Sequence, residues 1–284
     1  MEEFHPNHPY SPANALIPHY AENDRPLALV VGSLGVMLAT VGLGSAGLAA
    51  RVNPRLGVDE RWIVGWYSIC GFLHCFFEGY FVLNHATLAS QQTLFAQLWK
   101  EYALSDSRYL TSDPFMISVE TITVLVWGPL CFFAALCIVR RSSLRHPVQM
   151  MVCMGHLYGV VLYYSTSMAE QYYRGVAHSR PEVLYFWVYY FGFNLPWVIV
   201  PTFLLVRSIR AMRLAFMTLG SIQGVVCDLQ ERLHDIKKRS SDEDCGLETK
   251  GEEKSRNTER EREEDEDTGD DDTEEEDADT ESDE

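Results

Sequence analysis

Two ionisable side chains stand four residues apart in the otherwise apolar stretch 62–83. On a helix, His74 and Glu78 would lie one turn apart on the same face. A carboxylate in the hydrocarbon of a membrane costs roughly 3 kcal/mol or more, so it is rare there without a partner or a function. Glu78 can accept one ring N–H of His74, and the other ring nitrogen can then carry a proton. The spacing predicts a proton-transferring pair, with a structural hydrogen bond between two spans as the alternative.

A second intramembrane carboxyl group is expected in another apolar stretch. Polar and aromatic residues share one helical face in each of two stretches: Glu120, Thr123 and Trp127 within 116–139, and Asn194 and Trp197 within 185–206. If these faces converge, one pocket holds two carboxyl groups, a histidine and several indole rings. Two carboxyl groups in a low dielectric do not both ionise readily, so one keeps its proton and acts as an acid beside a base.

Such a pocket favours the movement of a proton onto and off an apolar molecule. Aromatic faces and the remaining carboxylate can stabilise the cation that forms between the two steps. Lipophilic amines, whose charge resembles that cation, are expected to bind as inhibitors. Taken alone, an aromatic stripe is more often packing or an interfacial belt. His156 has no partner in the sequence, and we expect a structural role for it.

The elements that would position these residues are five apolar stretches, each close to the roughly 20 residues that a bilayer-spanning helix needs. They are residues 26–50, 62–83, 116–139, 148–168 and 185–206. The pattern predicts an all-α membrane protein, a five-helix transmembrane bundle. Arginines concentrate in loops 51–61 and 140–147 and after residue 206. The positive-inside rule therefore places the C-terminus in the cytosol and the N-terminus in the lumen.

The negative charge of the chain is concentrated at its C-terminal end. Of 40 acidic and 23 basic residues, 24 acidic and 5 basic residues lie within 241–284. This composition predicts a disordered acidic tail, because it offers little apolar surface to bury. The expected division is a lumenal lead, a five-span domain, a cytosolic surface helix and the tail, at residues 1–25, 26–213, 214–240 and 241–284.

Two classes of function are disfavoured by composition. No basic patch argues for nucleic-acid binding. The seven cysteines include no C-x-x-C pair and lie mostly in apolar stretches, so we expect neither a disulfide framework nor a metal site.

Several motifs, taken in order, resemble the emopamil-binding protein family of 3-beta-hydroxysteroid Δ8–Δ7 sterol isomerases, which carry an EXPERA domain. They are HPY at 8–10, NDRP at 23–26, CGFLHCFFEGYFVL at 70–83, LWKEYALSDSRY at 98–109, ETITVLVWGPL at 120–130, GHLYGVVLYY at 155–164 and YFWVYYFGFNLPW at 185–197. The resemblance implies a protein of the endoplasmic reticulum membrane, surrounded by lipid and usually a homodimer. It further implies that a Δ8 sterol is isomerised without a cofactor.

The resemblance also implies roles for individual residues. Proton transfer falls to His74, Glu78 and Glu120, and cation–π support to Trp197. The remaining residues expected to contact substrate are Thr123, Asn194, Tyr102, Tyr109 and Trp127.

This chain departs from the family pattern in the fourth span. Val160 stands where the mammalian members have an acidic residue, and a second acidic residue is replaced near Ser167, so a role for those acids is not expected here. Two other functions remain as alternatives. One is a non-catalytic sterol or amine receptor of the same superfamily. The other is a proton-coupled transporter, against which the spans show no inverted repeat.

Overall fold

The computed structural model describes residues 8–266, apart from the side chains of residues 240–249, 261 and 263–266. Within this range all regular structure is helical, which confirms the all-α class. The chain divides into two compact units, Met1–Leu214 and Ala215–Glu284.

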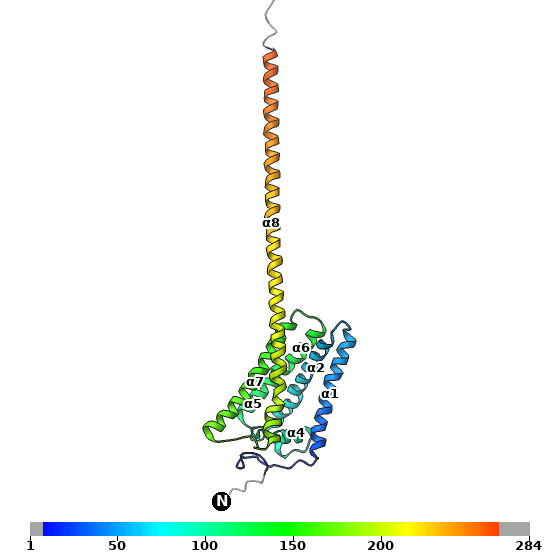
Figure 1. The fold of residues 1–284 in the computed structure, drawn as a ribbon, viewed down its shortest axis with the longest axis vertical. Helices are drawn as coiled ribbons and strands as arrows, with labels where there is room; N and C mark the ends of the chain where they lie inside the picture. Colours follow the sequence, from blue (N-terminus) through cyan, green and yellow to red (C-terminus); the bar gives the residue numbers. More distant parts are fainter. Residues whose placement is uncertain (1–7, 267–284) are drawn as a thin grey trace, which may run out of the picture. The chain divides into compact units, whose positions relative to one another are not determined.

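The first unit contains long helical segments joined by short connections (Figure 1). Two of the long segments are single helices, α1 (Leu27–Val52) and α7 (Arg145–Arg174). Between them lie two segments of three consecutive elements each: α2 (Val58–Phe72), η1 (Leu73–Glu78) and α3 (Gly79–Asn84), and then α5 (Pro114–Ile122), η4 (Thr123–Trp127) and α6 (Gly128–Val139). The last segment consists of η5 (Leu184–Phe191), η6 (Gly192–Asn194) and the start of α8 (Leu195–Glu266). Between α3 and α5 lie η2 (Leu88–Ser90), α4 (Leu94–Tyr102) and η3 (Ser107–Tyr109).

Three of the helices in the described residues are long and apolar enough to cross a membrane. They are Leu27–Val52, Pro114–Val139 and Leu184–Arg239. The other two expected spans, 62–83 and 148–168, are helical as well, but their helices are not among these three.

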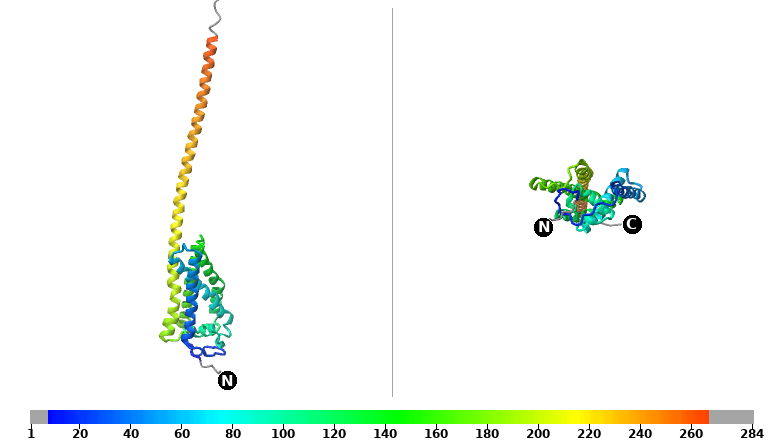
Figure 2. Two further views of the ribbon diagram at one scale, coloured as in Figure 1. Left: turned by 90° about the vertical axis from the view of Figure 1, so that its right-hand side faces the viewer. Right: turned by 90° about the horizontal axis from the view of Figure 1, so that it is seen from below.

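Neighbouring helices pack in sequence, with α1 on α2, α2 on α6 and α6 on α7 (Figures 1 and 2). Glycines permit the closest approaches. A Cβ on Gly65 would lie 2.9 Å from the carbonyl oxygen of Gly42, so α1 and α2 meet backbone to backbone there. Gln149 of α7 donates from Nε2 to the Leu204 carbonyl at 3.2 Å and to Ser208 Oγ at 2.7 Å. The first turns of α8 are thereby joined to α7.

Three π-helical segments, η1, η4 and η5, occur among the described residues of the first unit. A π-helical turn holds more residues than an α-helical turn and is common at functional sites. The segment η1 contains both His74 and Glu78, and η4 begins at Thr123 and ends at Trp127. Four of the candidate residues, His74, Glu78, Thr123 and Trp127, therefore lie where the helices are locally widened.

Helix α4 closes one end of the helical bundle, together with the lead at residues 8–25 (Figure 1). The lead is held by hydrogen bonds to α4: Tyr10 Oη donates to the Lys100 carbonyl at 3.1 Å, and Asn23 Nδ2 donates to the Gln97 carbonyl at 3.0 Å. On its other face, the Trp99 ring stacks on Phe77 at 4.4 Å between ring centroids. Trp99 Nε1 also donates to the Phe77 carbonyl at 2.9 Å. Helix α4 is therefore fixed directly to η1.

A buried ion pair anchors the segment after α4. Arg108 donates to both carboxylate oxygens of Asp106, from Nε to Oδ1 at 2.9 Å and from Nη2 to Oδ2 at 2.6 Å. The two side chains are only 2% and 0% exposed. Arg108 Nη1 donates to Thr166 Oγ1 of α7 at 3.0 Å. The pair thus ties the 103–113 connection to α7.

The second unit differs from the expectation of a disordered tail beginning at residue 241. Helix α8 passes through the expected surface helix at 214–240 and continues to Glu266. Residues 241–266 contain no proline and many Glu, Lys and Arg residues, which favour helix. Residues 267–284, the remainder of the expected tail, lie outside the described residues.

Asp106→Asn should destabilise the protein strongly, because Arg108 would keep its charge in a buried site without a counter-ion. Breaking a buried pair from one side costs about 3–5 kcal/mol. Thermal unfolding of the detergent-solubilised protein, followed by tryptophan fluorescence, measures the change. Glu182→Gln is the matched control, since the side chains of the Arg180–Glu182 pair are 28% and 48% exposed and its loss should hardly move the melting temperature. Equal melting temperatures for the two variants would contradict the anchoring role.

Candidate functional site

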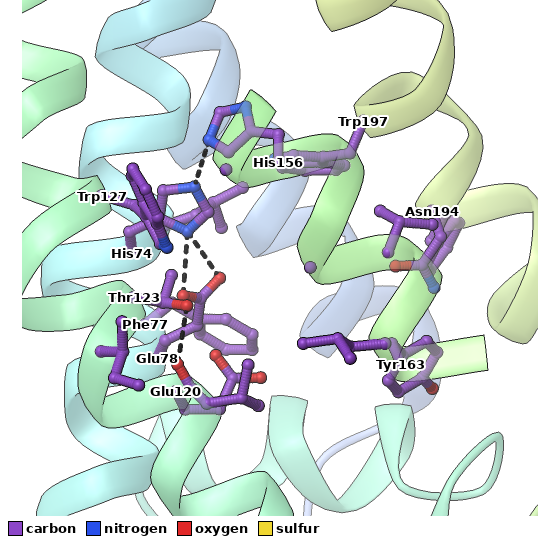
Figure 3. A pocket seen from close by; sticks show the side chains of 18 of the residues that line it. His74, Phe77, Glu78, Glu120, Thr123, Trp127, His156, Tyr163, Asn194 and Trp197 are labelled. Atoms are coloured by element: carbon purple, nitrogen blue, oxygen red, sulfur yellow. Dashed lines mark hydrogen bonds and ion pairs between the residues drawn. The ribbon is translucent and has the colours of Figure 1, made fainter. Parts of the chain in front are cut away.

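A cavity of about 330 Å³ opens between the helices of the first unit (Figure 3). Its walls come from η1, α4, η3, α5, η4, α7, η6 and the first turn of α8. The lining residues are Leu73, His74, Phe77, Glu78, Trp99, Tyr102, Tyr109, Val119, Glu120, Ile122, Thr123, Trp127, Gly155, His156, Tyr158, Gly159, Val160, Leu162, Tyr163, Phe193, Asn194 and Trp197. All nine residues singled out in the sequence are among them. Most of the lining is apolar or aromatic, which suits a lipophilic ligand.

His74 and Glu78 form a hydrogen-bonded pair on the wall of this cavity. His74 Nδ1 lies 2.9 Å from both Oε1 and Oε2 of Glu78 (Figure 3). Because an ionised carboxylate only accepts hydrogen bonds, the ring proton belongs on Nδ1. The His74 side chain is 6% exposed and that of Glu78 is 16% exposed. The pair is therefore largely removed from solvent, with Glu78 facing the cavity.

His156 contacts the other ring nitrogen of His74. The purely structural role that we expected for His156 from the sequence does not account for this contact. The two Nε2 atoms are 3.0 Å apart (Figure 3). With the His74 proton on Nδ1, its Nε2 accepts and His156 Nε2 donates. His156 Nδ1 is then buried without a hydrogen-bond partner among the described residues. Glu78, His74 and His156 consequently form one continuous chain of hydrogen bonds.

The second carboxyl group, Glu120, is held by a tyrosine from outside the long helices. Tyr109 Oη donates to Glu120 Oε1 at 3.0 Å. Burial raises the pKa of the Tyr109 phenol well above its ordinary value, so the phenol stays protonated and remains a donor. Figure 3 shows Glu78 and Glu120 next to each other at one end of the cavity. The cavity thus holds two carboxyl groups, each bonded to a different protein donor.

The opposite side of the cavity carries amide and aromatic groups (Figure 3). Asn194 Nδ2 donates to the Tyr190 carbonyl at 2.8 Å and, more weakly, to Tyr102 Oη at 3.4 Å. Tyr163 Oη and Trp197 Nε1 are buried and have no hydrogen-bond partner among the described residues. A buried donor without a hydrogen-bond partner is costly. These two groups are therefore available to a ligand that carries a polar atom.

Thr123 and Trp127 complete the wall formed by η4. Thr123 Oγ1 donates to the Val119 carbonyl at 2.9 Å, so towards the cavity its oxygen can only accept. The Trp127 ring lies flat against Gly155 of α7, where an added Cβ would approach ring atoms to 2.8 Å. Gly128 likewise allows α6 to approach η1 closely, because an added Cβ would lie 2.5 Å from Cys75 Sγ and 3.2 Å from His74 Cβ. The two glycines let η4 and α6 press against the helices that carry the two histidines.

The polar lining residues that sequence reasoning missed include His156 and Tyr163. Both lie on α7, seven residues apart, a spacing that places them on one helical face. That spacing was the available signal. The contact that gives His156 its importance joins residues 82 positions apart and has no local signature.

One group of side chains near the cavity could hold a metal ion. Cys70, His74 and His156 each offer a ligand atom, and these atoms lie within 4.8 Å of one another. A soft divalent ion such as Zn²⁺ prefers sulfur and imidazole ligands. In the structure, however, both ring nitrogens of His74 already have protein partners.

The arrangement is suited to acid–base chemistry on an apolar molecule. Two carboxyl groups and a histidine meet in a lining that is otherwise apolar and aromatic. In such surroundings a positive charge on the ligand would be stabilised by the carboxylates and by ring faces.

Comparison with known proteins agrees with this chemistry. Residues 94–208 match the family model described as EXPERA (EXPanded EBP superfamily). The chain is 36% identical over 209 residues to the 3-beta-hydroxysteroid-Δ8,Δ7-isomerase of Cavia porcellus, covering 72% of this chain and 89% of that protein. The enzyme of the same name from Mus musculus is 34% identical over 222 residues, covering 76% and 93%.

A plant protein is similar to the same extent. The probable 3-beta-hydroxysteroid-Δ8,Δ7-isomerase of Oryza sativa is 34% identical over 219 residues, which is 75% of this chain and 95% of that protein. The residues matched by the family model include the part of the cavity lining from Trp99 to Trp197. The chain therefore belongs to the EXPERA superfamily, in the family of the 3-beta-hydroxysteroid-Δ8,Δ7-isomerases.

Proposed function

We propose that this protein is a sterol Δ8–Δ7 isomerase that moves the ring double bond by protonation and deprotonation. The observation that carries the proposal is the pairing of Glu78 with His74 beside a second carboxyl group, Glu120, in an otherwise apolar cavity. The names of its relatives supply the substrate class.

The reaction is balanced in protons. The π electrons of the C8–C9 double bond take a proton at C9, and a cation develops at C8. Loss of a proton from C7 then places the double bond between C7 and C8. One carboxyl system must start each turnover protonated and the other free, and the cavity offers two: Glu78 with His74, and Glu120 with Tyr109. No cofactor is required for this sequence of steps.

The cation between the two steps needs stabilisation in a site with little water. The indoles of Trp127 and Trp197 line the same cavity as the two carboxyl groups. A cation within about 6 Å of an indole face gains roughly 2 kcal/mol when desolvated. We assign Trp197 to this role, and assign Thr123, Asn194, Tyr102 and Tyr109 to fixing the polarity and shape of the cavity.

The hydrogen bonds of His74 support a shared role for the two histidines. His74 holds its proton towards Glu78 because His156 donates to the opposite nitrogen. Once His156 is protonated on both ring nitrogens, it can pass its Nε2 proton to Nε2 of His74, and His74 can then pass its Nδ1 proton to Glu78, which leaves both rings neutral; among the described residues, His156 is the only neighbour with a hydrogen bond to His74 Nε2. The proton is thereby spread over a chain of three groups.

We further propose the membrane arrangement that follows from the charge pattern. Five spans within 26–213 would place the lead at 1–25 in the lumen of the endoplasmic reticulum and the segment after 213 in the cytosol. Three helices apolar enough to cross a membrane and the concentration of arginines on one side support this arrangement. The family resemblance supports a homodimer.

A non-catalytic sterol- or amine-binding protein is the second candidate. It is favoured by Tyr163 Oη and Trp197 Nε1, which have no hydrogen-bond partner in the described part of the chain and can bind a polar atom. Such a protein would bind a Δ8 sterol and return it unchanged.

Glu78→Gln should abolish isomerisation while leaving the protein folded, since the amide keeps the shape of the side chain but cannot exchange a proton. General acid–base groups contribute at least about 100-fold to rate. The measurement is incubation of purified protein with a Δ8 sterol, with product read by mass spectrometry. Glu101→Gln is the matched control, because Glu101 accepts from Tyr189 outside the cavity lining. A wild-type protein without Δ7 product would favour the non-catalytic candidate, and near-normal turnover by Glu78→Gln would remove the assigned role.

Glu120→Gln should weaken a lipophilic tertiary amine much more than a neutral sterol analogue of similar shape. The amine carries a charge where the sterol develops one, so it should bind more tightly than the neutral compound. A hydrogen bond to a charged group contributes roughly 1.5–3 kcal/mol, which corresponds to about 10- to 100-fold in affinity. Both affinities are measured on the same detergent-solubilised variant. Equal losses would show that Glu120 shapes the cavity without recognising charge.

A further inference from the structure

The second unit presents a regular apolar stripe along one side of a helix. Six large apolar residues follow one another at alternating intervals of three and four: Leu219, Ile222, Val226, Leu229, Leu233 and Ile236. All lie in α8, and each is between 45% and 62% exposed. Ala215 continues the alternating spacing towards the N-terminus and is exposed as well. We call residues 215, 219, 222, 226, 229, 233 and 236 the stripe.

The spacing of the stripe is that of a coiled coil. Apolar residues that alternate by three and four fill positions a and d of a heptad and form a narrow seam for a partner helix. Here Leu219, Val226 and Leu233 take position a, while Ile222, Leu229 and Ile236 take position d. Gly220 and Gly224 fall on the outer side. The stripe ends after Ile236, because the next a position is Ser240 and the next d position is Glu243.

The residues beside the stripe argue against a membrane surface as its occupant. A helix that lies on a bilayer has a broad apolar face opposite a basic one. Apart from Phe216 and Val225, polar residues instead flank the stripe on both sides, with Gln223, Gln230 and Lys237 on one side and Arg232 and Arg239 on the other. The outer side carries the acidic residues Asp228, Glu231 and Asp235, which anionic lipid would repel.

We propose that the stripes of two copies of this chain pair as a parallel two-stranded coiled coil. In each copy, residue 215 comes shortly after the last proposed span. Two copies inserted in the same direction therefore release their helices on the same side of the membrane, with the stripes at the same distance from it. Confinement in one membrane raises the effective concentration of the second helix, which a coil of only three heptads needs. The proposal depends on membrane insertion but not on the isomerase activity.

Most of the residues beside the seam are uncharged in this register. In a parallel pair, position g of one helix faces position e of the next heptad on the other helix. Thr218 would face Gln223 of the second copy, and Val225 would face its Gln230. Arg232 would face Lys237 of the second copy, but Asp228 of its own helix holds Arg232 Nε at 3.0 Å and offsets that repulsion.

Cysteine cross-linking of the full chain in membranes tests the proposal. Cys245 and the exposed Cys227 are first replaced by serine, and a single reporter is introduced as Leu229→Cys in the stripe or Glu231→Cys on the outer side. Mild oxidation followed by non-reducing electrophoresis should give at least 10-fold more dimer for Leu229→Cys. Equal yields at the two positions, or no dimer at position 229, would overturn the proposal. If the membrane domains associated while the α8 stripes stayed apart, position 229 would give no dimer.

A second comparison uses the Leu229→Cys reporter with a charge placed elsewhere on the helix. Ile222→Asp puts a carboxylate into the seam and should remove the cross-link, whereas Met217→Asp, the same kind of change on the outer side, should leave it within about twofold. Isomerase activity should be unchanged in both. If the stripe lay on lipid instead, a dye attached at position 229 would be quenched by spin-labelled lipid. In that case neither Leu229→Cys nor Glu231→Cys would cross-link. Equal effects of the two aspartates would likewise contradict pairing through the stripe.

Discussion

The hydrogen bond between His74 Nδ1 and the Glu78 carboxylate is the interaction on which the rest of the site depends. A carboxylate in an apolar cavity is stable only with a strong donor, and this donor comes from one turn away on the same widened helix. Holding His74 in that orientation requires His156 on its other side and Gly128 behind it. Closing the cavity requires α4 and the buried Asp106–Arg108 pair. The proposed proton transfer thus constrains packing on several helices.

Much of this site could be predicted from sequence because many of its reactive residues are spaced so that they share one face of a helix. A histidine and a glutamate four residues apart in an apolar stretch predict their own contact, and the structure has that contact. Glu120, Thr123 and Trp127 share a face of another helix, so their presence on one cavity wall follows from periodicity. Tyr102 and Tyr109 are different, since they lie in a connection and only the family resemblance pointed to them.

What the sequence did not reveal are features that depend on tertiary contacts. The His74–His156 contact joins two helices, and no local pattern records it. The π-helical widening at η1 and η4 leaves composition unchanged, so it has no signal in hydropathy. Charge density in residues 241–284 indicated disorder, yet the same glutamates, lysines and arginines favour helix, and α8 continues to Glu266. Apolar spacing in residues 215–236 was present in the sequence and gained meaning from its exposure on that helix.

Turnover of a Δ8 sterol in D₂O tests the central claim, that the cavity adds a proton to the ring and removes another. The proton donor exchanges with solvent between turnovers, so the Δ7 product should gain one deuterium, located at C9 by NMR. Glu78→Gln should lower product and label together, while Glu101→Gln should change neither. A Δ7 product formed at the normal rate without deuterium would contradict protonation by an exchangeable side chain and would point to a direct hydrogen shift within the sterol.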